Sequence, residues 1–214
     1  MGNIIADIRR DYKLQSLQEK DVAEQPIAQF DRWWKDAIES ELDEVNAMTL
    51  ATADATGAPS ARIVLLKGYD ERGFVFFTNY NSKKGQDIAA NPRVSLVFFW
   101  KELERQVNIS GSIEKVSVAE SDAYFQSRPV GSRIGAWCSP QSTVIADRQI
   151  LEDNITKYQA QFGDGPIPKP DHWGGYLVQP QSVEFWQGRS SRLHDRIKYR
   201  KNDQGLWIIE RLAP

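Results

Sequence analysis

Five strand-like segments follow one another between residues 47 and 116, and this succession constrains the fold more than any other feature of the chain. Turn signals such as Asp54–Gly57 and Asp70–Gly73 separate the first three, a spacing that favours an antiparallel meander over alternating βαβ units. The segments are rich in β-branched and aromatic side chains and cover residues 47–53, 60–67, 73–78, 93–100 and 105–116.

Helical patterns surround these strands. Apolar residues recur at helical spacing from Pro26 to about Leu42, behind a proline suited to a first helical turn. Further helices are predicted over residues 82–90, 117–127, 132–137 and 147–162, and returning strands over 176–178, 183–186, 194–200 and 206–211. We therefore predict an α+β protein built on a mainly antiparallel barrel with partial closure. Residues 1–25 are predicted to be a mobile arm and residues 26–214 a single domain.

The composition excludes several classes of protein. Among 214 residues, 27 Lys and Arg face 29 Asp and Glu, so no cationic field of the whole chain favours nucleic acid or an anionic membrane. Apolar runs such as Leu96–Trp100 are far shorter than the roughly 20 residues that span a bilayer. One Cys and two His make a poor zinc set, so no metal site is predicted. With acidic Asp7 and no signal-peptide core near the start, we expect a cytoplasmic protein.

The glycine-rich phosphate loops of dinucleotide and P-loop folds are absent from the sequence, and cations gather instead at separate places. One is Thr78–Lys84, where hydroxyls and two lysines meet a predicted helix start that favours phosphate. Its alternative is a solvated helix start with surface lysines. Another comprises Tyr124, Arg128 and Ser132, where Ser132 is expected to start a new helix beside the guanidinium. A surface arginine near a turn is equally compatible with this spacing.

Two further cation groups accompany strands. If residues 192–196 are extended, Arg192, His194 and Arg196 share one face, unless neighbouring acids neutralise them at the surface. Arg62 and Lys67 bracket an apolar strand, and they can serve one ligand if the strand bulges or ends near Gly68, or if the ligand wraps an edge. The side chains of Gln106, Gln141 and Ser142 could hydrogen-bond the edge of a heterocycle. Trp186 is the one tryptophan that is a candidate for stacking on a ligand.

Ordered motifs connect these sites with a known family. They include Arg62-Ile-Val-Leu-Leu-Lys67, Ser82-Lys-Lys84, Glu104-Arg-Gln106, Tyr124-Phe-Gln-Ser-Arg-Pro129, Glu184-Phe-Trp-Gln-Gly188, Arg192-Leu-His-Asp-Arg196 and Glu210-Arg-Leu-Ala-Pro214. In these motifs the chain resembles the pyridoxine (pyridoxamine) 5′-phosphate oxidases, flavoproteins of the vitamin B6 pathway, from about residue 26 onward. Phe77 stands where that family commonly has tyrosine, and Lys83 where it frequently has arginine.

The resemblance implies an FMN-binding split β-barrel that forms a homodimer, with flavin at the subunit interface. It implies that Lys67, Tyr124, Arg128 and Ser132 hold the substrate phosphate, while Arg192 and His194 meet its pyridine ring. Arg9 and Tyr12 belong to a segment that resembles one that can fold over the substrate. The residues implied to line FMN are Arg62, Ile63, Val64, Leu65, Leu66, Lys67, Phe77, Thr78, Lys83, Lys84, Gln106, Gln141, Ser142, Trp186 and Arg196.

The reaction implied by the resemblance is oxidation of pyridoxine or pyridoxamine 5′-phosphate to pyridoxal 5′-phosphate. Hydride goes to FMN and then O2 is reduced to H2O2, with NH3 released from the amine substrate. Arg192 and His194 are expected to orient the ring, and Arg192 to polarise the reacting group without acting as a base. Two alternatives stay open: another split-barrel flavin oxidoreductase, such as a flavin or haem-related reductase, and a non-catalytic module that binds FMN or pyridoxal phosphate.

Overall fold

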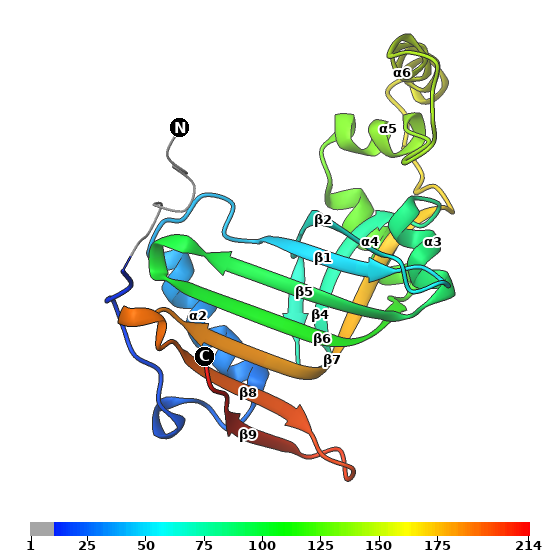
Figure 1. Ribbon diagram of the computed structural model, residues 1–214. Coiled ribbons are helices and arrows are strands. Elements are labelled where there is room, and N and C mark those ends of the chain that lie inside the picture. The colour runs from blue at the N-terminus through cyan, green and yellow to red at the C-terminus, as the bar shows by residue number, and fades with distance from the viewer. Residues whose placement is uncertain (1–10) are drawn as a thin grey trace, which may run out of the picture. The chain divides into compact units, whose positions relative to one another are not determined.

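The computed structural model describes residues 11–214, and within them the chain divides into two compact units (Figure 1). Unit 1 holds the described residues up to Thr49 together with Ser95–Gly111 and Pro180–Pro214. Unit 2 holds Leu50–Val94 and Ser112–Gln179. Strands β1, β5, β6 and β7 begin in one unit and end in the other.

The strands form one sheet in the order β2-β1-β5-β6-β7-β4-β3, with β8 paired to β7 and β9 paired to β8. The pairs β3–β4, β4–β7, β7–β8 and β8–β9 are antiparallel. The predicted meander of the first three strands is wrong in one respect, because β2 and β4 are not neighbours in the sheet. The bounds are β1 Ala47–Ala53, β2 Pro59–Leu65, β3 Gly68–Asp70, β4 Gly73–Asn79, β5 Arg93–Trp100, β6 Arg105–Lys115, β7 Trp173–Gln187, β8 Asp195–Lys201 and β9 Trp207–Arg211.

Three of the helices begin where the sequence signals predicted. Pro26 lies in the first turn of α2, the side chain of Ser82 caps α3, and Ser117 with Glu120 forms a complete capping box at α4. The α-helices are α2 Pro26–Glu39, α3 Lys83–Ala90, α4 Val118–Ser127, α5 Val130–Cys138 and α6 Gln149–Phe162; single 3₁₀ turns are η1 Glu19–Asp21, η2 Lys101–Leu103 and η3 Ser190–Arg192. None of the helices within residues 11–214 is long and apolar enough to cross a bilayer.

Two expectations about strands were wrong. The segments 176–178 and 183–186 belong to one strand, β7, in which Pro180 lies between the residues paired to β4 and those paired to β8. A proline has no backbone N–H to donate, and it is tolerated there because neither of these two ladders pairs residue 180. The strand predicted over 60–67 ends at Leu65, and the separate short strand β3 follows it.

The core of unit 1 forms under one face of α2. Phe30 and Trp33 are buried on this helix, and their rings lie 5.3 Å from Phe98 and 5.1 Å from Phe185. The guanidinium of Arg105 lies 4.5 Å from the centre of the Trp33 ring, so a cation packs on an aromatic face inside this unit. Aromatic burial of this kind supplies most of the apolar area that holds α2 in place.

Residues 11–25 contact the later segments of unit 1 through backbone groups. The N–H groups of Lys13 and Leu14 donate to Oε2 of Glu104 at 2.9 and 3.1 Å, and that of Leu17 donates to Oδ2 of Asp195 at 3.0 Å. The division into a mobile arm over 1–25 and one domain over 26–214 stays a prediction, and residues 1–10 lie outside the described part of the chain.

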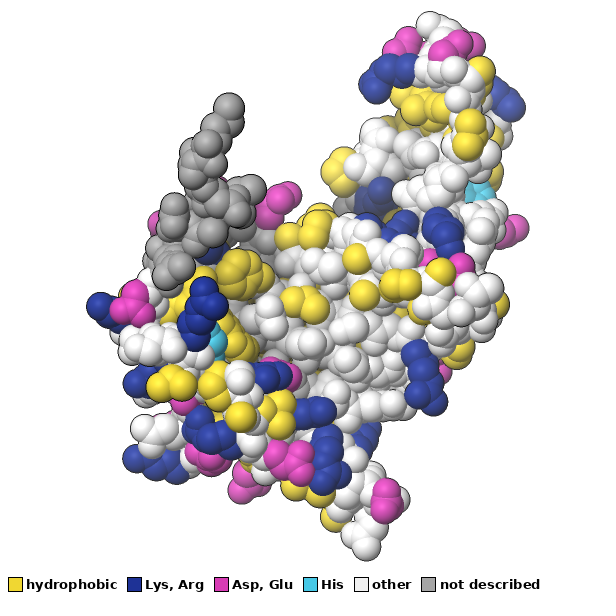
Figure 2. Space-filling model, in the orientation of Figure 1, with side chains coloured by type: hydrophobic (Ala, Val, Ile, Leu, Met, Phe, Trp, Pro, Cys, Tyr) yellow, Lys and Arg dark blue, Asp and Glu magenta, His cyan; other side chains and the backbone are white. Residues whose placement is uncertain are grey.

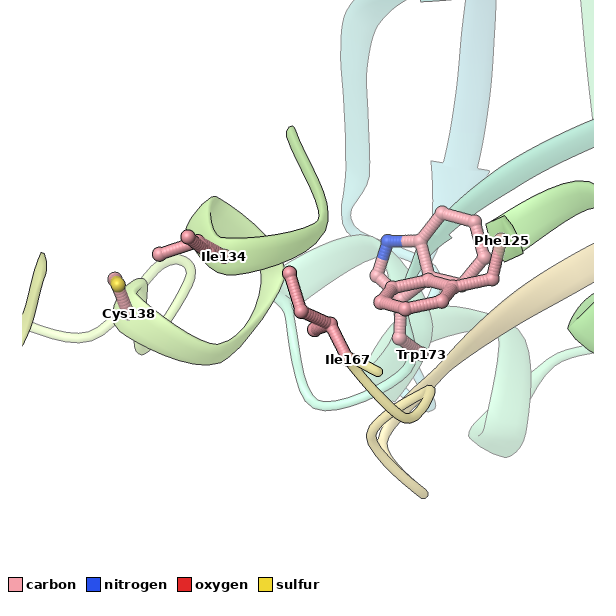
Figure 3. Close-up of a cluster of buried hydrophobic side chains, with 5 residues drawn as sticks. All are labelled: Phe125, Ile134, Cys138, Ile167 and Trp173. Atoms are coloured by element: carbon pink, nitrogen blue, oxygen red, sulfur yellow. The ribbon is translucent and has the colours of Figure 1, made fainter. Parts of the chain in front are cut away.

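A separate apolar cluster in unit 2 joins α4, α5 and the start of β7 (Figure 3). Phe125 meets the ring of Trp173 edge to face at a centroid distance of 5.2 Å, and Ile167 lies beside them. Ile134 and Cys138 extend the cluster along α5. Packing therefore fixes the two short helices relative to Trp173 within this unit.

Replacing Gly85 tests the packing at the start of α3. A Cβ atom there would lie 2.0 Å from the backbone oxygen of Tyr80, so Gly85→Ala is expected to destabilise the protein by about 1–3 kcal/mol. The matched variant is Gly131→Ala in the first turn of α5, where a Cβ atom meets nothing within 4 Å. It should be neutral or stabilising by up to about 1 kcal/mol. Urea unfolding measures both, and equal effects of the two variants would contradict the prediction.

Candidate functional site

Unit 2 contains a cavity of about 700 Å³ at which β2, β4, α4, α5 and the starts of α3 and β7 converge. Among the described residues that line it, four carry cations, namely Arg62, Lys67, Lys84 and Arg128, and none carries a carboxylate. The predicted site residues that the structure brings to this wall are Arg62, Ile63, Val64, Leu65, Lys67, Phe77, Thr78, Lys84, Tyr124, Arg128, Ser132 and Gln141.

The end of β2 explains how Arg62 and Lys67 both reach the cavity. They are five positions apart and would point to opposite faces of a regular strand. Since β2 ends at Leu65, Lys67 lies beyond the strand, where its backbone N–H donates to the carbonyl oxygen of Val75 at 2.8 Å. Of the options that the sequence left open, the early end of the strand is the one observed, at Leu65 and not near Gly68, where β3 begins.

Lys84 reaches the cavity from the first turn of α3. Its Nζ donates to Oε1 of Gln141 at 2.9 Å and lies 3.2 Å from the hydroxyl of Ser82. Burial, and secondly the nearby charge of Arg62, lower the pKa of Lys84. Burial likewise lowers the pKa of Arg62, although the charge of Asp87 opposes this shift. The two cations lie near each other without an acid between them on the lining, which favours the binding of an anion.

Arg128 carries a donor without a partner. It follows α4 directly, and its guanidinium lies 4.6 Å from the centre of the Trp173 ring. Its Nη1 is buried and has no hydrogen-bond partner among the described residues, and burial lowers the pKa of the side chain. A buried cationic donor that faces a cavity is satisfied by an anionic ligand.

The surroundings of Arg128 correct one expectation. Ser132 does not start a helix, because α5 begins at Val130 and the N–H of Ser132 already donates to the carbonyl oxygen of Pro129 at 2.9 Å. The hydroxyl of Ser132, and not its backbone N–H, is the group it offers to the cavity. Tyr124 stacks on Phe77 at a centroid distance of 3.9 Å, so aromatic faces complete the wall.

Three residues of unit 2 that the resemblance implied as FMN contacts do not line the cavity. Leu66 is buried, and Ser142 lies in the loop after α5 with a φ of 69°. The Nζ of Lys83 lies 2.5 Å from Oδ1 of Asp87 and 3.8 Å from Oδ2 of Asp54, so acids outside the wall hold it.

An aromatic cluster in unit 1 contains Tyr12, Trp186 and His194. The rings of Trp186 and His194 lie 4.6 Å apart, and the Tyr12 ring lies 5.8 and 6.1 Å from them. The backbone N–H of Arg189 donates to Nδ1 of His194 at 3.1 Å, which leaves Nε2 as the site of the proton in the neutral ring. Burial, followed by the charge of Arg192, lowers the pKa of His194.

The expectation that Arg192, His194 and Arg196 share one strand face was wrong. Arg192 ends the 3₁₀ turn η3 with a φ of 61°, and β8 begins only at Asp195. Arg196 is neutralised by an acid, since its Nε donates to Oε1 of Glu184 at 2.7 Å. This is the alternative that the sequence left open for Arg196.

The remaining predicted residues and one missed residue complete the comparison. Gln106 lies in the part of β6 that belongs to unit 1, and Arg9 lies outside the described residues. Trp173 was missed as a site residue, because a tryptophan before two glycines carries no sequence signal that distinguishes a cavity wall from a core.

On the face drawn in Figure 2, Lys and Arg side chains are interspersed with Asp and Glu, which fits the balanced charge of the sequence.

Comparisons with known proteins cover nearly the whole chain. Residues 34–162 match the family described as pyridoxamine 5′-phosphate oxidase, and residues 173–214 match the pyridoxine 5′-phosphate oxidase C-terminal dimerisation region. A protein of Paraburkholderia phymatum named pyridoxine/pyridoxamine 5′-phosphate oxidase is 60% identical, with 98% of this chain and 99% of that protein covered. One of the same name from Trichormus variabilis is 56% identical, with 100% of each chain covered.

Solved structures agree with the fold class. PhzG from Burkholderia lata 383, in complex with tetrahydrophenazine-1-carboxylic acid, has a TM-score of 0.89 at 28% identity and covers 96% of this chain and 100% of its own. An FMN-binding protein of Nostoc punctiforme, related to pyridoxamine 5′-phosphate oxidase, has a TM-score of 0.71 at 20% identity, with 90% and 100% covered. The predicted split-barrel fold class is confirmed.

Removing Arg192 tests the electrostatics around His194. Because the charge of Arg192 disfavours the imidazolium, Arg192→Ala is expected to raise the pKa of His194 toward its ordinary value. NMR titration of the imidazole protons measures this, and with two histidines in the chain the His172 signals serve as an internal reference. An unchanged or lower pKa of His194 in the variant would show that Arg192 does not act on the ring.

Proposed function

Because the chain belongs to the pyridoxine/pyridoxamine 5′-phosphate oxidase family, we propose that it is an FMN-dependent oxidase of vitamin B6 phosphates. It converts pyridoxine or pyridoxamine 5′-phosphate to pyridoxal 5′-phosphate, with O2 as electron acceptor, H2O2 as product and NH3 released from the amine. The observation that carries the proposal is the cavity of unit 2, whose wall offers four cations and no carboxylate within the described lining. Such a wall suits ligands that bring their own negative charge.

The donor set fits a phosphorylated flavin. Arg62 and Lys84 supply adjacent charges for a phosphate, while Thr78 and Gln141 add neutral hydrogen-bonding groups. Ile63 in β2 is 64% exposed on the same wall and offers apolar contact to a flat ring. When bound, the flavin supplies the hydride acceptor and the reaction with O2, which no protein side chain provides.

A second set of groups on the same wall suits the phosphate of the substrate. Lys67, Tyr124, Arg128 and Ser132 come from the end of β2, from α4 and from α5. Stacking on Trp173 holds the guanidinium of Arg128 in one plane, which favours paired hydrogen bonds to phosphate oxygens. We assign these four residues to the substrate phosphate, so that binding energy from the phosphate positions the ring.

We assign the pyridine ring of the substrate to Arg192 and His194. His194 holds its proton at Nε2, because Nδ1 accepts the Arg189 N–H, so the neutral imidazole presents a donor. The guanidinium of Arg192 donates hydrogen bonds and polarises the reacting group without acting as a base. Tyr12 packs on His194 and Trp186, close to where Gly188 leaves room for its ring. Holding the ring within about 1 Å of the productive geometry is worth on the order of 100-fold in rate.

Other predicted features belong to the same proposal. The match to a dimerisation region over residues 173–214 supports a homodimer. FMN at the interface between two copies, its contacts with Gln106, Trp186 and Arg196, the cover by Arg9, and a cytoplasmic location stay predictions from the sequence.

The proposed reaction is tested by anaerobic reduction of the bound flavin. The purified protein is expected to show a flavin spectrum that bleaches when pyridoxamine 5′-phosphate is added without O2, and to release H2O2 and pyridoxal 5′-phosphate when air is admitted. Absorbance and a peroxide assay measure both steps. A flavin that neither B6 phosphate reduces would favour another split-barrel oxidoreductase, and tight binding without peroxide would favour a non-catalytic module.

Replacing Arg128 tests the phosphate assignment. Arg128→Met should raise the KM for pyridoxamine 5′-phosphate roughly 10- to 100-fold, since a charge-assisted hydrogen bond is worth about 1.5–3 kcal/mol. The kcat/KM for unphosphorylated pyridoxamine should change little. The matched control is Arg133→Met, since Arg133 binds Gln126 through Nη1 at 2.8 Å and does not line the cavity. Equal losses on both substrates would contradict the assignment.

A further inference from the structure

Asp87 is a buried carboxylate that lies behind the wall of the cation cavity without lining it. It belongs to α3, and its residue is 1% exposed. No motif singled it out, and the function proposed above gives it no role. Burial alone would raise its pKa, but hydrogen bonds from Lys83, Thr52 and Ser60 together lower it, so Asp87 is held as an anion.

Two hydroxyl groups connect this carboxylate to Arg62. The Oγ1 of Thr52 donates to Oδ2 of Asp87 at 2.7 Å, and the Oγ of Ser60 donates to the same oxygen at 3.0 Å. Arg62 in turn donates from Nη1 to the Thr52 hydroxyl at 2.8 Å and from Nη2 to the Ser60 hydroxyl. The direct distance from Nη2 of Arg62 to Oδ2 of Asp87 is 3.9 Å, so the hydroxyls mediate the contact.

The direction of these hydrogen bonds depends on the charge of Asp87. A hydroxyl has one proton to donate, and an ionised carboxylate can only accept. Because both hydroxyls give their proton to Asp87, their lone pairs are free to accept from the guanidinium of Arg62. A further bond from Nη1 to the carbonyl oxygen of Leu50, at 3.2 Å, completes the set that holds this side chain.

The second oxygen of Asp87 acts on a different cation. Oδ1 lies 2.5 Å from the Nζ of Lys83, the neighbour of Lys84 in the first turn of α3. The Lys83 ammonium therefore lies beside Asp87 and Asp54, which do not line the cavity, while Lys84 faces the cavity. Asp87 therefore holds Lys83 away from the cavity wall and fixes the orientation of the Arg62 guanidinium on that wall.

We propose that Asp87 is a positioning residue for the cofactor phosphate: through the hydroxyls of Thr52 and Ser60 it fixes the guanidinium of Arg62 toward the bound phosphate. The inference rests on the proposed function, because it takes FMN as the ligand of the Arg62 and Lys84 side of the cavity. It assigns Asp87 no contact with the ligand. Its effect passes through Arg62.

A double-mutant cycle separates this role from a general contribution to folding. Asp87→Asn keeps the shape but replaces an oxygen with a donor, which competes with Arg62 for the two hydroxyls. We expect the Kd of FMN to rise roughly 10- to 100-fold and that of riboflavin, which lacks the phosphate, to change less than about 2-fold. In the Arg62→Ala background, Asp87→Asn should weaken FMN binding less than about 2-fold further, because no guanidinium is left to position.

Two further variants keep the test decisive. Asp54→Asn is the matched control, since Asp54 also faces Lys83 but makes no contact with Arg62; FMN affinity should stay within about 2-fold of the wild type. If Asp87→Asn does not fold, Ser60→Ala removes one mediating hydroxyl and keeps the carboxylate, and it should weaken FMN selectively over riboflavin.

The outcomes distinguish this inference from the function on which it rests. Flavin fluorescence titration gives both Kd values for each variant. A wild-type protein that does not bind FMN overturns the proposed function and the role of Asp87 together. Wild-type binding with equal losses for FMN and riboflavin, or with effects of Asp87→Asn and Arg62→Ala that add fully, overturns the role of Asp87 and leaves the proposed function in place.

Discussion

The interaction on which the cavity depends is the repulsion among cations that share a wall without a carboxylate. Desolvating cationic groups is costly, and bringing them together adds a further cost. Neighbouring groups offset this cost: Asp87 does so for Arg62 from behind the wall, while the side-chain oxygen of Gln141 and the ring of Trp173, both on the wall, do so for Lys84 and Arg128. Each arrangement fixes a cation, and other N–H donors of the same cation remain to bind a ligand in the cavity. The ligand then completes the charge balance, which ties the affinity of this site to phosphate.

This constraint explains why the site lies where secondary structure elements begin and end. Lys67 lies past the end of β2, Lys84 in the first turn of α3, and Arg128 between α4 and α5. Ends of elements can present side chains from several directions to one point, which a single strand or helix cannot do. The tight contact between Gly85 and the Tyr80 carbonyl, and the cluster of Phe125 and Trp173, hold these ends in place.

Local signals account for what the sequence predicted correctly. Caps at Ser82 and Ser117, turns at Gly57 and Gly73, and β-branched runs act through neighbouring residues, so they fix element bounds to within a few positions. The failures depend on partners far along the chain. That β7 continues through Pro180 depends on where β4 and β8 pair with it. That Arg196 is neutralised depends on Glu184, which lies on β7 two positions from Trp186, the cross-strand partner of Arg196. Asp87 was missed because nothing near it in sequence shows that Thr52 and Ser60 donate to it.

The two units offer different chemistry, each suited to a different kind of chemical group. The cavity of unit 2 is cationic, whereas the cluster in unit 1 is built from the rings of Tyr12, Trp186 and His194. A phosphate gains most from fixed positive charge, and an aromatic ring gains most from flat apolar faces and a few oriented donors. Burial, and secondly the charge of Arg192, lower the pKa of His194, so the neutral imidazole can offer one donor from Nε2 to a ligand ring without a second positive charge beside that of Arg192.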